Sequence, residues 1–161
     1  MITCYIAIGS NLSDPVAQAL DAMEALKSLP KSSVIQCSSL YSSTPMGPAN
    51  QPDYINAVVK IQTELTPLEL LDCTQAIELE QGRVRKDERW GPRTLDLDLI
   101  LYGNEVIDSE RLTIPHYGMK EREFVLYPLA EITPNLQLPD GTELTSLLKQ
   151  VDRNGLSVWQ S

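Results

Sequence analysis

A stretch of alternating leucines and aspartates, "TLDLDLILY" at residues 94–102, constrains the fold of this chain more than any other segment. Alternation with a period of two predicts a β-strand, because successive side chains of a strand point to opposite faces of its sheet. One face must then lie on an apolar core, while the other carries two like charges, Asp96 and Asp98. We expect the core face to consist of Leu95, Leu97, Leu99 and Leu101.

Periodicity and capping signals divide the rest of the chain into further strands and helices. Asp14 and Thr66 each precede a proline, a pattern typical of helix N-termini. The predicted order is β-α-β-β-α-β, the ferredoxin-like α+β arrangement, in which helices pack on one antiparallel sheet. We expect the first and fourth strands to be its central pair, followed by a C-terminal extension. The predicted segments are strands 2–8, 33–42, 54–63 and 94–102, helices 15–29 and 67–81, a short strand 104–107, and helical stretches 123–131 and 142–150.

Length and composition suit one globular domain over residues 1–161. With 161 residues, 42% of them hydrophobic, the chain is long enough to bury an apolar core. No apolar run is long enough to cross a membrane, and the N-terminus lacks the pattern of a signal peptide, so we expect a cytoplasmic protein. The cysteines are few and widely spaced, which argues against a disulfide framework or a zinc site and favours core positions for Cys4, Cys37 and Cys73.

Charge is distributed unevenly along the chain. The formal net charge is −9, yet six of the seven arginines lie between residues 83 and 122. A net negative charge argues against nucleic acid as the main partner. An arginine-rich zone in an acidic protein is typical of a site for a compact anion such as phosphate, and solubilising surface charge is the alternative interpretation.

Asp96 and Asp98 are candidate metal ligands. Their Cα atoms would be about 6.6–7 Å apart on one face of a strand, so the two carboxylates can converge on one cation. Two Mg²⁺ ions about 3.5–4 Å apart serve phosphoryl transfer, and Mg²⁺ accepts a few carboxylates completed by water and phosphate. The alternative is an exposed strand face with ordinary acidic residues. Arginines on both sides favour the site for metal and polyphosphate; they are Arg83, Arg85, Arg93 and Arg111.

Aromatic and amide residues suggest a site for a flat heterocycle. Tyr54 and Asn56 share one face of the strand 54–63, and Trp90 lies in the basic loop. Aromatic rings stack on heterocycles, and an amide offers a donor and an acceptor to their edge. Core packing is the alternative for Tyr54 and for Phe124.

The single histidine and the first glycine motif are less informative. His116 lies between Arg111 and Arg122, where a phosphate contact or a proton-donor role competes with a structural hydrogen bond. The "GSN" at residues 9–11 has too few glycines for a phosphate-binding loop, and we interpret it as a turn. A nucleotide would therefore bind without a Walker motif.

Several blocks of sequence carry a resemblance to a known family. They read "RWGPRTLDLDLILYG" at 89–103, "TIPHYGMKEREFVL" at 113–126, "YIAIGSNL" at 5–12, "QPDYINAVV" at 51–59 and "IELEQGRVRKDERWGPR" at 77–93. These blocks resemble the signatures of the 6-hydroxymethyl-7,8-dihydropterin pyrophosphokinases of folate biosynthesis. The resemblance covers nearly the whole chain. It implies transfer of pyrophosphate from ATP to the hydroxymethyl oxygen of the pterin, giving AMP and the pterin diphosphate.

The resemblance also implies roles for individual residues. Asp96 and Asp98 would hold two Mg²⁺ ions, and Arg83 and Arg93 would act with them in catalysis. On the pterin side, the implied contacts are Ser43, Thr44, Met46, Tyr54, Asn56 and Phe124. On the ATP side, they are Gln75, Glu78, Arg85, Trp90, Leu99, Arg111, Thr113, His116, Tyr117 and Arg122. The chain departs from the family at Ser43 and Thr44, where the family has a threonine and a proline.

Two other classes of function are compatible with the residues alone. A metal-dependent nucleotidyltransferase or nuclease also uses paired aspartates and two metal ions. A ferredoxin-like ligand-binding or regulatory module would share the fold without the chemistry. The partners we expect are ATP and a small pterin, with no nucleic acid and no membrane, and we expect a monomer.

Overall fold

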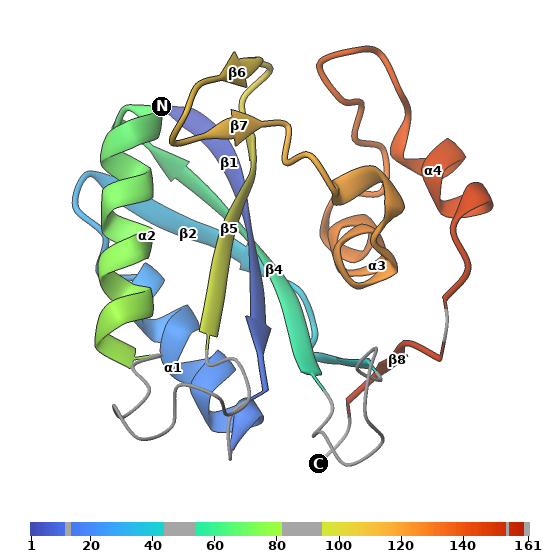
Figure 1. Ribbon diagram of the computed structural model, residues 1–161, viewed down its shortest axis with the longest axis horizontal. Coiled ribbons are helices and arrows are strands. Elements are labelled where there is room, and N and C mark those ends of the chain that lie inside the picture. Colours follow the sequence, from blue (N-terminus) through green and yellow to red (C-terminus); the bar gives the residue numbers. More distant parts are fainter. Residues whose placement is uncertain (12–13, 44–53, 82–94, 154, 160–161) are drawn as a thin grey trace.

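The computed structural model describes residues 1–11, 14–43, 54–81, 95–153 and 155–159, and it contains the predicted β-α-β-β-α-β order with additional elements (Figure 1). The α+β class is confirmed. The strands are β1 (Ile2–Ser10), β2 (Ser32–Cys37), β3 (Tyr41–Ser43), β4 (Tyr54–Thr63), β5 (Leu95–Tyr102), β6 (Ile107–Asp108), β7 (Thr113–Ile114) and β8 (Ser157–Val158). The helices are α1 (Pro15–Leu26), α2 (Pro67–Gln81), α3 (Glu123–Ile132), α4 (Leu144–Gln150) and the short 3₁₀ helix η2 (Met119–Glu121).

The strand order differs from the prediction in one respect. The main sheet runs β5-β1-β4-β3-β8, and β2 also pairs with β4. The central pair is therefore β1 and β4, and the prediction that the first and fourth strands are central is wrong. Among the described residues, β5 pairs with β1 alone. The reason lies in the two helical connections: α1 leads from β1 to β2 past β4, and α2 leads from β4 to β5 past β1.

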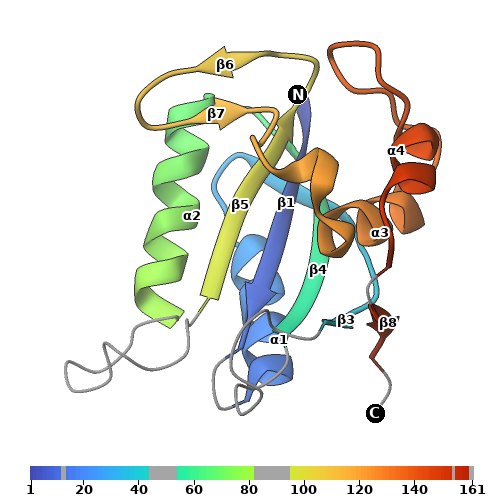
Figure 2. The same cartoon turned by 45° about the vertical axis from the view of Figure 1, so that its right-hand side comes forward.

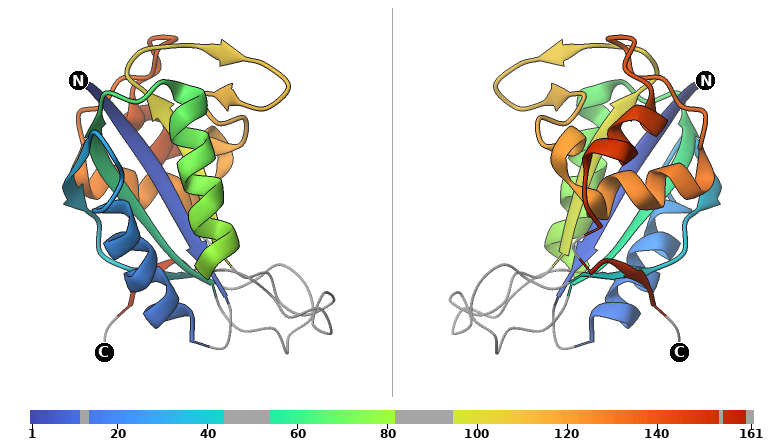
Figure 3. Two further views of the ribbon diagram at one scale, coloured as in Figure 1. Left: turned by 90° about the vertical axis from the view of Figure 1, so that its left-hand side faces the viewer. Right: turned by 90° about the vertical axis from the view of Figure 1, so that its right-hand side faces the viewer.

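Different helices cover the two faces of the sheet. Helices α1 and α2 lie in front of one face and α3 and α4 in front of the other, as the two opposite views of Figure 3 show. Strand β1 serves both layers, because Cys4, Ile6 and Ile8 pack with α1 and α2 while Tyr5 and Ala7 pack with α3 and α4. The alternation of apolar residues in the sequence thus follows the pleat of the sheet.

A β-bulge in β5 moves Leu101 off the predicted core face. Tyr5 pairs with Leu101 and Ile6 pairs with Leu99, so Ile100 is an extra residue on β5. The first three leucines of the strand pack with α1 and α2, whereas Ile100 and Leu101 pack with α3. The prediction for Leu101 is wrong, because a period of two cannot anticipate an inserted residue.

Most of the predicted helix starts and strands are confirmed. The Asp14 carboxylate accepts a hydrogen bond from Ala17 N at 3.2 Å, and Thr66 and Glu69 form a reciprocal capping box. The strand predicted over 33–42 is divided into β2 and β3. Ser38 lies between them and binds the backbone of the residue opposite, Val58, through both its own backbone and its hydroxyl.

Other expectations concern the cysteines, membranes and the domain. Cys4 is buried, Cys37 and Cys73 are partly buried against the same core, and all three are free thiols, as predicted. Among the described residues, no helix has the length and apolar character needed to span a membrane. A single domain over residues 1–161 stays a prediction.

Candidate active site

The two aspartates occupy the α3 side of β5, opposite the face that packs on α1 and α2. Strand pairing places Asp96 in one row with Gly9 of β1 and Asn56 of β4. Asp98 lies in the next row, beside Ala7. The register therefore brings a predicted metal ligand and a predicted pterin ligand to the same row of the sheet, with a glycine between them.

Gly9 leaves the middle of this row without a side chain. A Cβ built at Gly9 would have Asn56 Oδ1 as its nearest described neighbour, at 3.7 Å, which is an ordinary van der Waals contact. Gly9 and Ser10 belong to β1, so the interpretation of residues 9–11 as a turn is wrong for these two residues. Sequence reasoning missed Gly9 as a site residue, although a glycine inside a strand is a known sign of close approach by a ligand or another chain.

A pocket of about 300 Å³ lies beside the open edge of β5. It lies between α2 and the segment 110–117. Figure 2 shows that the β6–β7 hairpin, which follows β5, extends over the N-terminal end of α2. Among the predicted site residues, the lining includes Gln75, Glu78, Asp98, Leu99, Arg111, Thr113, His116 and Tyr117. The remaining lining residues, which the sequence analysis did not identify, are Leu71, Leu97, Glu110 and Leu112.

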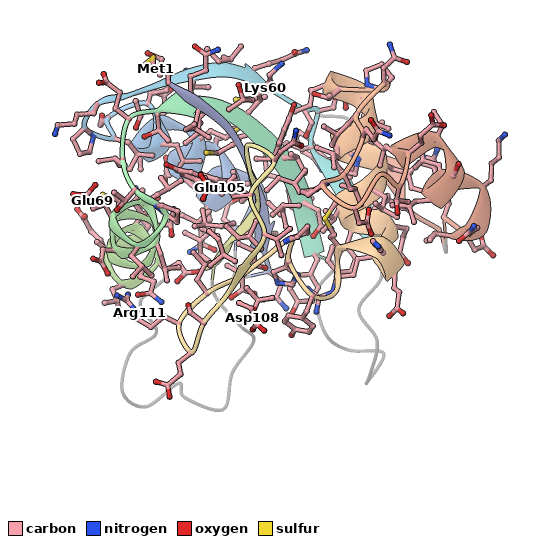
Figure 4. The ribbon with its side chains drawn as sticks, turned by 90° about the horizontal axis from the view of Figure 1, so that it is seen from above. Met1, Lys60, Glu69, Glu105, Asp108 and Arg111 are labelled. Carbon is pink, nitrogen blue, oxygen red and sulfur yellow. The ribbon has the colours of Figure 1, made fainter. Side chains whose placement is uncertain are left out.

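Side chains of α2 organise this pocket. Glu78 Oε2 accepts a hydrogen bond from Leu97 N of β5 at 2.7 Å, which satisfies a backbone donor on an edge strand. The guanidinium of Arg111 donates to Asp72 Oδ1 at 2.6 Å and to Gln75 Oε1 at 3.1 Å. Figure 4 shows Arg111 beside α2. Asp72 is a further residue that sequence reasoning missed.

The bulge in β5 helps to place His116. His116 N donates to the carbonyl of the extra residue, Ile100, at 3.1 Å. The ring accepts a hydrogen bond from Gly118 N on Nδ1 at 3.1 Å, so a neutral ring carries its proton on Nε2, which lies 4.0 Å from Asp98 Oδ2. Burial lowers the pKa of His116 below 6.5, Asp98 opposes this shift, and the positive charge of Arg122 reinforces it.

Arg122 lies between the two groups of predicted ligands. Its guanidinium carbon is 5.6 Å from the centroid of the Tyr117 ring and 5.7 Å from that of Phe124. The Tyr117 ring stacks on His116 with centroids 4.7 Å apart, and Tyr117 is 80% exposed. An aromatic residue this exposed beside a pocket offers a surface for a ligand.

The predicted pterin ligands come from three elements. Tyr54 begins β4 and pairs with Ser43 of β3, while Asn56 is buried two residues further along β4. Phe124 lies in the first turn of α3 and packs partly against the core on that side of the sheet. The strand face that carries Asn56 is thus next to both the carboxylates and α3.

Six of the predicted site residues lie outside the described residues, so their placement is not part of the site described above. They are Thr44, Met46, Arg83, Arg85, Trp90 and Arg93. Within the described part of the chain, no group of three or more histidine, cysteine, aspartate or glutamate side chains is placed to hold a metal ion. Any metal bound at Asp96 and Asp98 would need ligands from elsewhere.

The fold and the site define a class of protein: an α+β protein with a ferredoxin-like sheet, paired carboxylates on one face of that sheet and a pocket at its edge. The comparisons with known proteins agree. Residues 5–134 match the family described as 7,8-dihydro-6-hydroxymethylpterin-pyrophosphokinase (HPPK). The chain belongs to this family, and the resemblance noted in the sequence is confirmed.

Individual relatives are similar over most of their length. The chain is 59% identical over 150 residues to the 2-amino-4-hydroxy-6-hydroxymethyldihydropteridine pyrophosphokinase of Haemophilus influenzae, covering 93% of each chain. It is 53% identical over 152 residues to the Pseudomonas aeruginosa protein of the same name, covering 94% of this chain and 93% of that one.

Solved structures support the fold. A chain described as HPPK-DHPS in complex with substrates aligns with a TM-score of 0.71 at 12% identity, over 93% of this chain and 45% of that one. The Plasmodium falciparum HPPK-DHPS with pteroate aligns with a TM-score of 0.72 at 13% identity, over 92% of this chain and 42% of that one. This chain therefore spans less than half of those longer chains, and at such identities the likeness concerns the fold alone.

Proposed function

We propose that this protein uses the row Asp96–Gly9–Asn56 and the adjoining pocket to transfer pyrophosphate from ATP to the hydroxymethyl group of 6-hydroxymethyl-7,8-dihydropterin. Membership of the pyrophosphokinase family gives the reaction class. The observation that carries the assignment of residues is the strand register, which joins Asp96 to Asn56 across a glycine. This row lies on the α3 face of the sheet, and the pocket adjoins it at the β5 edge, where Asp98 belongs to the lining.

ATP would bind on the side of the β5 edge. Arg111 and His116 are suitable contacts for phosphate oxygens, since a guanidinium and an imidazole N–H both donate to anions. The exposed ring of Tyr117 and the amide of Gln75 are suitable contacts for the nucleoside. The pocket joins these groups to Asp98, which belongs to its lining.

The pterin would bind on the side of β4 and α3. Asn56 would donate to and accept from the polar edge of the ring, because its amide offers both functions. Tyr54 and Phe124 would stack on the ring faces. Arg122, near Phe124 and Tyr117, would lie where the two substrates meet.

Asp96 and Asp98 fit Mg²⁺ by the chemistry of their side chains. Mg²⁺ is bound by one or two carboxylates together with waters and substrate phosphates, so a site without a third protein ligand is suitable for it. When bound there, Mg²⁺ would neutralise the charge of the polyphosphate. We include in the proposal that two Mg²⁺ ions bind at Asp96 and Asp98. We also include that the protein is cytoplasmic and monomeric.

The chemistry requires chiefly placement and charge neutralisation from the protein. The hydroxymethyl oxygen forms a bond to the β-phosphorus, the bond from that phosphorus to the oxygen bridging to the α-phosphate breaks, AMP leaves, and the hydroxyl proton goes to solvent. The chain offers no dedicated base among the residues assigned, so we propose none. Arg83 and Arg93 are the proposed transition-state contacts, and both lie outside the described residues.

A product assay tests the proposal. Incubation with ATP, Mg²⁺ and the hydroxymethyl dihydropterin, followed by nucleotide chromatography, should yield AMP in amounts equal to the diphosphorylated pterin. Asp96→Asn and Asp98→Asn should remove AMP formation while calorimetry still detects pterin binding. ADP as the product, or near-normal AMP formation by both variants, would contradict the assignment.

The same assay separates the two alternative classes. A nucleotidyltransferase would release inorganic pyrophosphate, and a nuclease would cut a polynucleotide without any need for the pterin. A regulatory module would bind ligand without forming AMP. Light scattering of the purified protein tests the proposed monomer.

A further inference from the structure

The carboxylate of Glu131, near the C-terminal end of α3, binds the segment around β3, which pairs with the β4 residues predicted to contact the pterin. Glu131 Oε1 and Oε2 lie 3.0 and 3.1 Å from Ser39 N, and the Ser39 hydroxyl donates to Oε2 at 2.9 Å. The Tyr41 hydroxyl donates to Oε1 at 2.7 Å. One side chain therefore binds two residues of the segment around β3, and hydrogen bonds to a charged acceptor are stronger than neutral ones.

The Tyr41 hydroxyl is a reliable donor in this cluster. Tyr41 is only 6% exposed. Burial raises the pKa of Tyr41 above its ordinary value, and the hydrogen bond to Glu131 raises it further. The phenol thus stays protonated at neutral pH and donates to the carboxylate.

The residues held by Glu131 lead directly to the proposed pterin site. Tyr41 pairs with Asn56 across β3 and β4, and Ser43 pairs with Tyr54. On the outer side of β3, Tyr41 pairs with Val158 of β8. Strand β3 is therefore paired on both sides in the sheet, and Glu131 joins α3 to the segment that contains this strand.

The other end of the same helix carries another predicted pterin ligand, Phe124. Phe124 precedes Glu131 by two turns of α3, about 10 Å along a helix axis. Both residues lie in one ten-residue helix, which contains Pro128 between them, and the inference requires that a shift at Glu131 be transmitted along this helix to Phe124. The separation between Phe124 and the pair Tyr54 and Asn56 sets the space available to a flat ring.

We propose that Glu131 is a positioning residue for the pterin site: its hydrogen bonds to Ser39 and Tyr41 set the distance between α3, which carries Phe124, and β4, which carries Tyr54 and Asn56. This inference rests on the proposed function, since it assumes that the pterin binds between these elements. The described lining of the pocket at the opposite edge of the sheet comes from α2, β5 and the segment 110–117 and includes no residue of α3, so we expect the effect of Glu131 to fall mainly on the pterin.

The test is Glu131→Gln in the full-length protein. An amide has nearly the same shape but only one acceptor oxygen, so Ser39 and Tyr41 lose part of their hydrogen bonding. We expect KM and the calorimetric Kd for the pterin to rise about three- to tenfold, which is less than the loss of a whole hydrogen bond to a charged group. KM for ATP should stay within about twofold of wild type, because none of the described residues that line the pocket at the β5 edge belongs to α3.

Two further variants make the result decisive. Tyr41→Phe removes one hydrogen bond of the same cluster and should raise the pterin KM without adding fully to the effect of Glu131→Gln in the double variant. Tyr5→Phe is the matched control: it removes a hydrogen bond of 3.0 Å between Tyr5 and Thr133, which joins the same end of α3 to β1 instead of β3. The control should leave the pterin KM unchanged.

The outcomes separate this inference from the proposed function. A wild-type protein that forms no AMP contradicts the proposed function. Active wild type with an unchanged pterin KM in Glu131→Gln, or with equal rises for pterin and ATP, overturns the positioning role. An equal rise in Tyr5→Phe also overturns it, because general loosening of α3 would then be the cause. Circular dichroism of each variant verifies the fold, and Ser39→Ala provides a milder change if Glu131→Gln does not fold.

Discussion

Gly9 offers a sharp test of where the two substrates meet. Its neighbours across the sheet are Asp96 on one side and Asn56 on the other. Adjacent strands are about 4.8 Å apart, so roughly 10 Å separates the backbones of these two residues. We expect the reacting oxygen of the pterin to lie above Gly9, between the carboxylate and the amide.

Gly9→Ala should leave the fold intact and disturb the chemistry. The added Cβ would be 3.7 Å from Asn56 Oδ1, which requires no rearrangement of the described atoms. Alanine is also better suited to a strand than glycine, so the free energy of unfolding should be unchanged or up to about 1 kcal/mol higher. A methyl group in the row would displace the reacting atoms by about 1 Å, and a misplacement of that size lowers the rate about a hundredfold.

The measurements are kcat/KM from AMP formation and the midpoint of thermal unfolding. A hundredfold loss corresponds to about 2.7 kcal/mol of transition-state stabilisation. Gly9→Ser, which is larger, should lose more activity than Gly9→Ala. A folded Gly9→Ala protein with activity within about threefold of wild type would show that the substrates do not meet above Gly9, and the reasoning from strand register would then be wrong.

Two further predictions concern the stability and reactivity of the fold. The hydrogen bond from the Thr66 backbone N–H lowers the pKa of Glu69 in the folded protein. At pH values above the ordinary pKa of about 4.3, the ionised carboxylate therefore stabilises the folded state. This contribution is lost as the pH falls through the lowered pKa of the folded protein. Urea unfolding of wild type and Glu69→Gln should therefore differ at pH 7 and converge in acid; a difference that grows in acid would contradict the capping role. Burial raises the pKa of Cys4 to about 12, so iodoacetamide at pH 8 should label Cys37 and Cys73 before Cys4, as mass spectrometry of peptides can measure. Early labelling of Cys4 in the folded protein would contradict this prediction, because it would show that the core around β1 is accessible to the reagent.

The pocket at the edge of β5 brings together many of the residues predicted to contact ATP. Seven of its predicted residues do line one cavity with Asp98, although they come from α2, β5 and the segment 110–117. Their grouping came from a family resemblance, because no local pattern connects Gln75 to His116. Asp72 was missed for the same reason: it acts by holding Arg111, a residue far away in the sequence.

The errors have a common physical origin in long-range pairing. The central pair was wrong because strand order depends on how each helix crosses the sheet. Leu101 was misplaced because the bulge at Ile100 changes the phase of the alternation within one strand. Residues 9–11 were interpreted as a turn from the local motif "GSN", whereas pairing with β4 and β5 continues β1 through Gly9 and Ser10.

The sequence by itself determined the features that depend on neighbouring residues: the alternation that places Asp96 and Asp98 on one face, the helix caps, and the ferredoxin-like order of elements. Only the tertiary structure decided which distant residues meet, such as Gly9 between Asp96 and Asn56, or Glu131 on Ser39 and Tyr41. Local patterns follow from the geometry of a single strand or helix. Strand order and register arise from the packing of all the elements together, and the site depends on them.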